Sequence, residues 1–289
     1  MTGTVPGTLF TLLSAAGFSA VSILTSLAMR GGTSLYAVLA WRYVLASLLL
    51  LAWVFSRAGQ KPMPAAHALR WVGIGGGMLA FQVGLALSSL QWITPATLAF
   101  LFYTYPAWVA LVQAVRGAEA LDARRAAALA LSLLGVALMA GTPGGGPDAW
   151  KGYALALGAA LSYAIYIPTV ARMQSGWPIV TTSAYASVGA AVCFVALALA
   201  QGTFTADLPA QARAAVVGLT LFSTILPTMF FLMALQRLSP VRMAIISTVE
   251  PFMTAVLGLV VLSQPLTAAT MVGGALIAGA VILLQFRQE

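Results

Sequence analysis

One carboxylate of this chain lies in an unusual place. Glu250 stands inside a long apolar run, with Ser247 three residues before it and Thr254 four residues after it. Helical spacing places these three side chains on one face. A carboxyl group at such a position is costly, and it can exchange a proton or bind a cationic group of a solute. Two interpretations are open, namely a coupling or amine-binding residue, or a structural group fixed by Pro251 or paired with Arg42.

A second set of candidates is aromatic and polar. Tyr103 and Tyr105 precede Pro106 in an apolar run, and Tyr163 and Tyr166 are three residues apart, so they share a helix face. Tyrosines also form belts at membrane interfaces, where apolar runs end. These four tyrosines lie deep within their apolar runs, which favours a solute site. The residues predicted to bind solute are Gln82, Tyr103, Tyr105, Tyr163, Tyr166, Ser247 and Glu250.

Arg42 is the one basic residue that lies inside a long apolar run of the sequence. A structural salt bridge or a hydrogen bond to a backbone carbonyl is the favoured interpretation. The alternative is a long side chain that reaches the interface or a solute cavity.

Enzymatic chemistry finds little support in the residue types. His67, the one histidine, lies between apolar runs, as do Lys61 and Lys151. These positions leave no histidine for an intramembrane dyad, a haem or an HExxH site, and no lysine for a buried Schiff base. The glycine-rich stretch 141–151, GTPGGGPDAWK, lacks the GxxxxGK[ST] pattern of a phosphate loop. We predict no catalytic residue, no metal ligand and no cofactor, and the sequence contains no ATP-binding motif.

The composition of the chain predicts membrane helices as the secondary structure that carries these residues. Of 289 residues, 61% are hydrophobic and 7% are charged, far below the charge of a soluble domain. The 14 basic residues are scattered between apolar runs and form no nucleic-acid-binding stripe. Gly73 and Gly77 have the spacing of a close helix-packing face. Ten spans are predicted, at about residues 8–29, 35–56, 71–90, 95–115, 126–141, 152–171, 178–200, 214–236, 240–262 and 268–286.

One stretch of the chain occurs twice. Residues 89–106, SLQWITPATLAFLFYTYP, align without a gap with residues 234–251, ALQRLSPVRMAIISTVEP. In each copy a hydroxyl residue precedes a proline (Thr94–Pro95 and Ser239–Pro240), which predicts a capped helix start. The second prolines, Pro106 and Pro251, free a carbonyl four residues back and bend the helix. Each break then lies ~16 Å from the helix start, near the middle of the bilayer.

The repeat extends over the whole chain at a constant offset of 145 residues. Gly7 matches Gly152, and Pro64 matches Pro209. Residues 1–143 and 144–289 are therefore predicted to be two five-helix repeats of a single transport domain. Because five is odd, the second repeat enters the membrane from the opposite side, so the repeats are inverted.

The basic residues predict the orientation. If the N-terminus is cytoplasmic, ten basic residues lie in inner loops and three in outer loops. The inner set is Arg57, Lys61, Arg70, Arg116, Arg124, Arg125, Arg172, Arg237, Arg242 and Arg287, and the outer set is Arg30, Lys151 and Arg213. The positive-inside rule therefore places both termini in the cytoplasm.

These features resemble the drug/metabolite transporter superfamily, in particular its EamA-type ten-span permeases. The resemblance rests on the duplicated five-span unit, on Trp41 and Arg42, on the two repeated lines, and on Glu250 followed by Pro251. The stretches Tyr103–Pro106 and Ser162–Tyr166 look like those of the amino-acid exporters in that group.

The resemblance implies a multi-pass transporter of the inner (plasma) membrane that works by alternating access, with Pro106 and Pro251 at its gating kinks. The expected function is the export of small metabolites, and amino acids are the first candidates for the substrate. The expected partners are a small solute and the lipid bilayer. The alternatives are a drug or nucleotide-sugar permease of the same fold, or a membrane receptor or scaffold with a sealed core. Substrate, direction, coupling ion and oligomeric state are left open.

Overall fold

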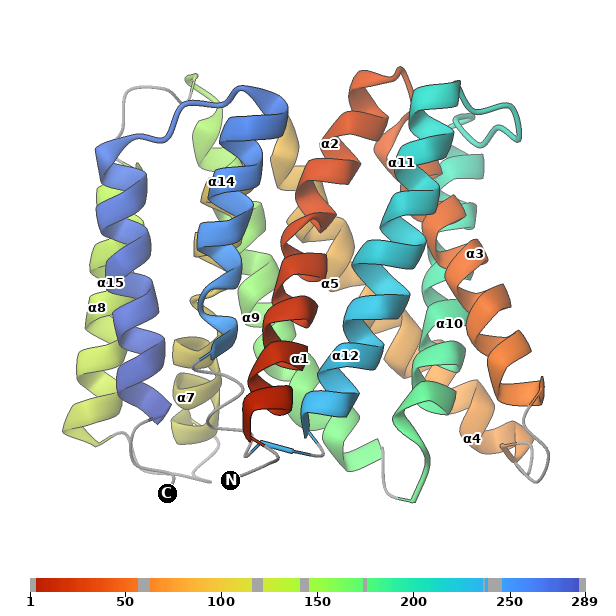
Figure 1. Cartoon of the computed structure of the whole chain (residues 1–289), viewed down its shortest axis with the longest axis horizontal. Helices are drawn as coiled ribbons and strands as arrows, with labels where there is room; N and C mark the ends of the chain where they lie inside the picture. Colours follow the sequence, from red (N-terminus) through yellow and green to blue (C-terminus); the bar gives the residue numbers. More distant parts are fainter. Residues whose placement is uncertain are drawn as a thin grey trace. The chain divides into compact units, whose positions relative to one another are not determined.

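A computed structural model describes residues 4–56, 63–115, 122–140, 146–173, 176–235, 237–238 and 246–285 (Figure 1). These residues form helices, with no strand among them, which confirms the all-α prediction. The elements from the first half are α1 (Thr4–Ser19), α2 (Val21–Arg30), α3 (Leu35–Ser56), α4 (Ala65–Arg70), η1 (Trp71–Gly76), α5 (Gly77–Ser88), η2 (Ser89–Gln91), α6 (Pro95–Phe102), α7 (Tyr105–Val115) and α8 (Ala123–Ala140). The second half contributes α9 (Ala149–Met173), α10 (Ile179–Ala200), α11 (Ala210–Thr220), η3 (Leu221–Ile225), α12 (Leu226–Leu235), α14 (Glu250–Leu262) and α15 (Ala268–Gln285).

Six of the described helical stretches are long and apolar enough to cross a membrane. They are Pro6–Arg30, Leu35–Ser56, Ala65–Gln91, Ala149–Val170, Ile179–Ala200 and Ala210–Phe231, and they coincide with six of the predicted spans. The other four predicted spans are not among these six. One is divided into α6 and α7, and the described apolar stretches within the other three are Ala126–Leu138, Glu250–Leu262 and Ala268–Leu283. The total of ten stays a prediction.

The fourth and ninth predicted spans are interrupted at equivalent positions. Helix α6 ends at Phe102 and α7 begins at Tyr105, so residues 103–104 form a turn. In the second half, residues 248–249 form the corresponding turn just before α14, again at an offset of 145. A break ahead of each repeated proline is therefore confirmed.

The helix start of the first copy is also confirmed. Thr94 caps α6 by accepting a hydrogen bond from the Thr97 backbone nitrogen at 3.2 Å, and Pro95 occupies the first helical position. The second predicted start, Ser239–Pro240, lies outside the described residues.

The chain folds into two compact units. The first unit comprises Met1–Ile23, Leu85–Ile165 and Leu226–Glu289, and the second comprises Leu24–Gly84 and Tyr166–Ile225. Each unit therefore combines segments from both halves of the sequence. The division into two repeats at residues 143–144 remains a prediction about the sequence.

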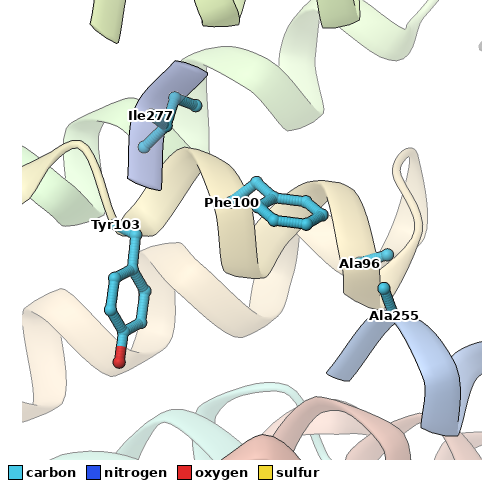
Figure 2. Packing of buried hydrophobic residues seen from close by; sticks show 5 residues of the cluster. All are labelled: Ala96, Phe100, Tyr103, Ala255 and Ile277. Carbon is cyan, nitrogen blue, oxygen red and sulfur yellow. The ribbon is translucent and has the colours of Figure 1, made fainter. Parts of the chain in front are cut away.

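In the first unit, α1 packs on α12 and α14, and α8 packs along α15 (Figure 1). Helix α6 packs on α14 and α15. The core where these helices meet contains Phe100 and Tyr103 from α6 and its end, together with Ile277 from α15 (Figure 2). Phe100 also makes an edge-to-face contact with Phe252, with ring centroids 5.0 Å apart. A Cβ atom on Gly274 would lie 2.3 Å from the Phe100 ring, so this glycine makes room for the ring.

In the second unit, α10 packs against α3 and against the π-helical turn η1. Gly76 and Gly189 bring the backbones of η1 and α10 together, since a Cβ on Gly189 would lie 1.9 Å from the Val72 carbonyl oxygen. The prediction that Gly73 and Gly77 form a close packing face is wrong. A Cβ atom added to either glycine would have no neighbouring atom within 4 Å. The wider π turn carries one residue more than an α turn, so a face inferred from α-helical spacing does not hold along it.

Candidate functional site

The side chain of Tyr103 connects the two interrupted spans. Its hydroxyl oxygen lies 2.9 Å from the backbone carbonyl oxygen of Ser247 and 2.8 Å from Oε2 of Glu250. Tyr103 is 8% exposed, and in Figure 2 its ring extends away from Ile277. The turn that ends α6 therefore reaches directly to the turn that precedes α14.

The Ser247 carbonyl needs this donor because of Pro251. In a continuous helix the carbonyl of residue 247 would accept from the backbone nitrogen of residue 251, but proline has no N–H. An unpaired carbonyl in a membrane interior costs several kcal/mol. The Tyr103 hydroxyl supplies the missing donor from another helix.

The Tyr103 hydroxyl has one proton and two acceptors in reach. If Glu250 is ionised, that proton can serve either the carboxylate or the Ser247 carbonyl, and the other acceptor lacks it. If Glu250 carries a proton, its own O–H donates to the Tyr103 oxygen and Tyr103 donates to Ser247, so both bonds form. Within the first unit, the described residues give Glu250 no ion pair with a basic side chain. The observed arrangement therefore suits a protonated carboxyl group.

An aromatic cluster continues from Tyr103. The rings of Tyr105 and Tyr163 meet edge to face with centroids 4.9 Å apart, and Tyr105 lies 6.0 Å from Tyr103. Phe102 completes the cluster, at 5.2 Å from Tyr163 and 5.9 Å from Tyr105. Phe102 was not predicted as a site residue, since apolar side chains are too common in these helices to single one out.

Five of the seven predicted solute-binding residues thus come together in the first unit: Tyr103, Tyr105, Tyr163, Ser247 and Glu250. The other two, Gln82 on α5 and Tyr166 on α9, belong to the second unit. Gln82 is 7% exposed, and its Oε1 has no hydrogen-bond partner in the described part of the chain. The role of all seven in binding stays a prediction.

Thr254, expected beside Glu250 on a polar face, contacts backbone. Its hydroxyl oxygen lies 3.1 Å from the Glu250 carbonyl oxygen and 3.1 Å from that of Ser19, where α1 ends. Thr254 therefore joins α14 to the end of α1, and its described bonds do not involve the Glu250 carboxyl group.

Arg42 is buried in the second unit, 6% exposed. Its Nε donates to the Thr224 hydroxyl at 3.0 Å, and the guanidinium lies 5.2 Å from the centre of the Tyr43 ring. The favoured prediction named a carboxylate or a carbonyl as its partner, whereas the described hydrogen bond is to a threonine. Thr224 could not be predicted because it lies 182 residues from Arg42.

The described ranges contain no group of three or more His, Cys, Asp or Glu side chains that could hold a metal ion. No residue of these ranges is therefore assigned as a metal ligand.

The described residues form helices, six of them long and apolar enough to cross a membrane, and two predicted spans are broken at equivalent positions. This is the pattern of a polytopic membrane protein. The sequence model of the EamA-like transporter family matches it twice, over residues 5–141 and 150–286. The chain therefore belongs to the EamA-like transporter family, with two family repeats, and it is a membrane transporter of the drug/metabolite type.

The other comparisons add the fold alone. No curated protein sequence matches the chain. A solved structure, described as "Crystal structure of protein", has 20% sequence identity and a TM-score of 0.67, covering 98% of each chain.

Proposed function

We propose that this protein is a secondary transporter that exports small amphipathic metabolites across the inner membrane by alternating access. Amino acids are the first candidate substrates. The observation that carries the proposal is the Tyr103 hydroxyl, which contacts Ser247 and Glu250 across two interrupted spans. In transporters built from inverted repeats, discontinuous helices form the solute site and rearrange during transport. Both termini are cytoplasmic in this proposal.

Glu250 is the proposed coupling residue. When its carboxyl group is protonated, Tyr103 holds both Glu250 and the free carbonyl of Ser247. Loss of that proton, or capture of the carboxylate by a substrate amine, leaves Tyr103 with two competing acceptors and weakens the contact between the breaks. Proton or amine binding is thereby linked to movement at Pro106 and Pro251.

The aromatic cluster is proposed to hold the apolar part of the solute. The rings of Phe102, Tyr105 and Tyr163 come from α6, α7 and α9 and lie beside the carboxyl-bearing site. Gln82 and Tyr166 lie in the second unit, and their predicted contacts with a solute stay a separate part of the proposal. An amphipathic solute with an amine and an apolar side chain fits this combination of groups.

The test is transport by the purified protein in proteoliposomes, with a panel of radiolabelled amino acids and neutral metabolites. Glu250→Gln keeps the size and the hydrogen bonding of the side chain but cannot titrate. If Glu250 couples protons, the variant loses net transport against a gradient and retains equilibrium exchange. If Glu250 binds a substrate amine, both activities fall, and neutral solutes are least affected.

Asp148→Asn is the matched control. It removes an exposed carboxylate that pairs with Lys151 at 2.9 Å, away from the breaks, and should leave every activity unchanged. Unchanged activity of Glu250→Gln at all pH values would show that Glu250 is structural. Absence of transport for all solutes by the unmodified protein would favour a receptor or scaffold.

A further inference from the structure

Arg42 is a buried cation for which the described residues of its own unit provide no carboxylate partner. It is the eighth residue of α3 and is 6% exposed. The second unit contains one acidic residue, Asp207, which is exposed. Within this unit, the described residues give Arg42 no ion pair.

The guanidinium has more donors than acceptors. Of its five N–H bonds, the one on Nε is directed to the Thr224 hydroxyl at 3.0 Å. Nη1 is buried and has no hydrogen-bond partner among the described residues. The Tyr43 ring, 5.2 Å from the guanidinium carbon, stabilises the charge but accepts no conventional hydrogen bond.

The position of the guanidinium is fixed from two sides. Trp41 donates from Nε1 to the Thr205 carbonyl at 2.8 Å and stacks on Phe204 at 5.6 Å, so this part of α3 is anchored to the segment between α10 and α11. Thr224, from the π-helical turn η3, donates to the Leu219 carbonyl at 2.9 Å while it accepts from Arg42.

The π-helical turn is itself informative. Such turns are rare and occur frequently at functional sites. In η3, the turn places Thr224 against Arg42 and also leaves the Ser223 hydroxyl buried without a hydrogen-bond partner in the described chain. Polar groups of this kind are normally satisfied, so each unpaired one requires an explanation.

A purely structural role explains these observations poorly. A bond from one side chain to the Thr224 hydroxyl needs a single donor, which a neutral residue could provide. A buried guanidinium without an anion is strongly unfavourable, and ionisable groups inside membrane proteins are retained mainly at sites of function.

We propose that Arg42 binds an oxyanion, a carboxylate or a phosphate group, through Nη1, with Thr224 as its positioning residue. The inference rests on the proposed transport function, in which the anionic group belongs to the solute. A planar guanidinium suits a carboxylate or phosphate because it offers parallel N–H bonds in a fixed geometry. The headgroup of an anionic lipid presents the same chemistry, and the experiment separates the two sources.

The experiment measures binding to the full-length protein in phosphatidylcholine nanodiscs by titration calorimetry. The probes are phenylacetate, its neutral isostere phenylacetamide, and inorganic phosphate. We expect phenylacetate or phosphate to bind at least about tenfold more tightly than phenylacetamide, because the neutral probe cannot form a charged pair. Arg42→Gln should abolish this preference, and Arg42→Lys should retain part of it.

Two further variants guard against misinterpretation. Thr224→Val leaves Arg42 in place and removes its acceptor, so the preference should fall severalfold even if Arg42→Gln folds poorly. Arg213→Gln removes an exposed guanidinium from the same unit and should leave the preference unchanged.

The outcomes are distinct. An anion preference that survives in both Arg42→Gln and Thr224→Val overturns the proposal, as does the absence of any anion effect on the unmodified protein. If soluble anions do not bind but phosphatidylglycerol raises the melting temperature of the unmodified protein and not that of Arg42→Gln, the oxyanion site is supported with lipid as its source. Solute transport by the unmodified protein combined with an anion preference independent of Arg42 overturns the Arg42 proposal while the transport function stands.

Discussion

The Tyr103 hydroxyl lies 2.9 Å from the carbonyl oxygen of Ser247, a backbone acceptor that loses its helical donor because residue 251 is proline. The two residues are 144 positions apart, one in each half of the chain. A helix break in the second half is thus completed by a side chain at the equivalent break in the first half.

Removal of the Tyr103 hydroxyl should leave Ser247 without a donor. We expect Tyr103→Phe to lower stability in detergent by about 1–3 kcal/mol, because the buried carbonyl of Ser247 is left without a donor. Transport should fall more strongly, because Glu250 loses the same partner. Thermal unfolding and proteoliposome flux measure the two effects. Tyr185→Phe, at a partly buried tyrosine of the second unit, is the control and should change neither.

Replacement of Pro251 should close the second break. In Pro251→Ala, residue 251 gains an N–H that can donate to the Ser247 carbonyl, so the turn at residues 248–249 can become helical. We expect slower amide hydrogen exchange in this segment together with slower transport. The control is Pro168→Ala, because Pro168 lies within the continuous helix α9. Equal exchange rates in the original protein and Pro251→Ala would contradict the role of the proline.

Close packing in the second unit depends on particular glycines. An alanine Cβ at residue 189 would lie 1.9 Å from the Val72 carbonyl oxygen, so Gly189→Ala must displace backbone. We expect a loss of stability of about 1–3 kcal/mol, the usual range for overpacking. Gly73→Ala should be neutral or slightly stabilising, because nothing lies within 4 Å of its Cβ. Thermal unfolding measures both variants. A Gly73→Ala variant less stable than Gly189→Ala would contradict the structure.

Reporter fusions test the membrane topology. The ten-to-three distribution of basic residues predicts that a fusion after Arg57 reports from the cytoplasm and a fusion after Lys151 from the outside. The opposite result at both positions would reverse the orientation, and the same compartment at both would remove the basis for inverted repeats.

The class of protein, the duplication and the positions of the two helix breaks can be predicted from the amino-acid sequence. These features depend on local properties, namely apolar runs long enough for a bilayer and prolines that lack an N–H. The local sequence around each proline predicts a break, and the structure has a turn two or three residues before each proline. Proline alone is nonetheless insufficient, because α9 continues through Pro168.

Long-range contacts are visible only in the folded chain. Helical spacing and the positions of the prolines make Tyr103 and Glu250 candidate site residues, but they cannot show that Tyr103 donates to the carbonyl freed by Pro251, nor that Arg42 contacts Thr224. Gly76, and not Gly73 or Gly77, packs closely because η1 is wound as a π turn. Such pairings join residues more than a hundred positions apart or depend on the winding of a helix, and both are set by packing of the whole unit instead of by neighbouring residues.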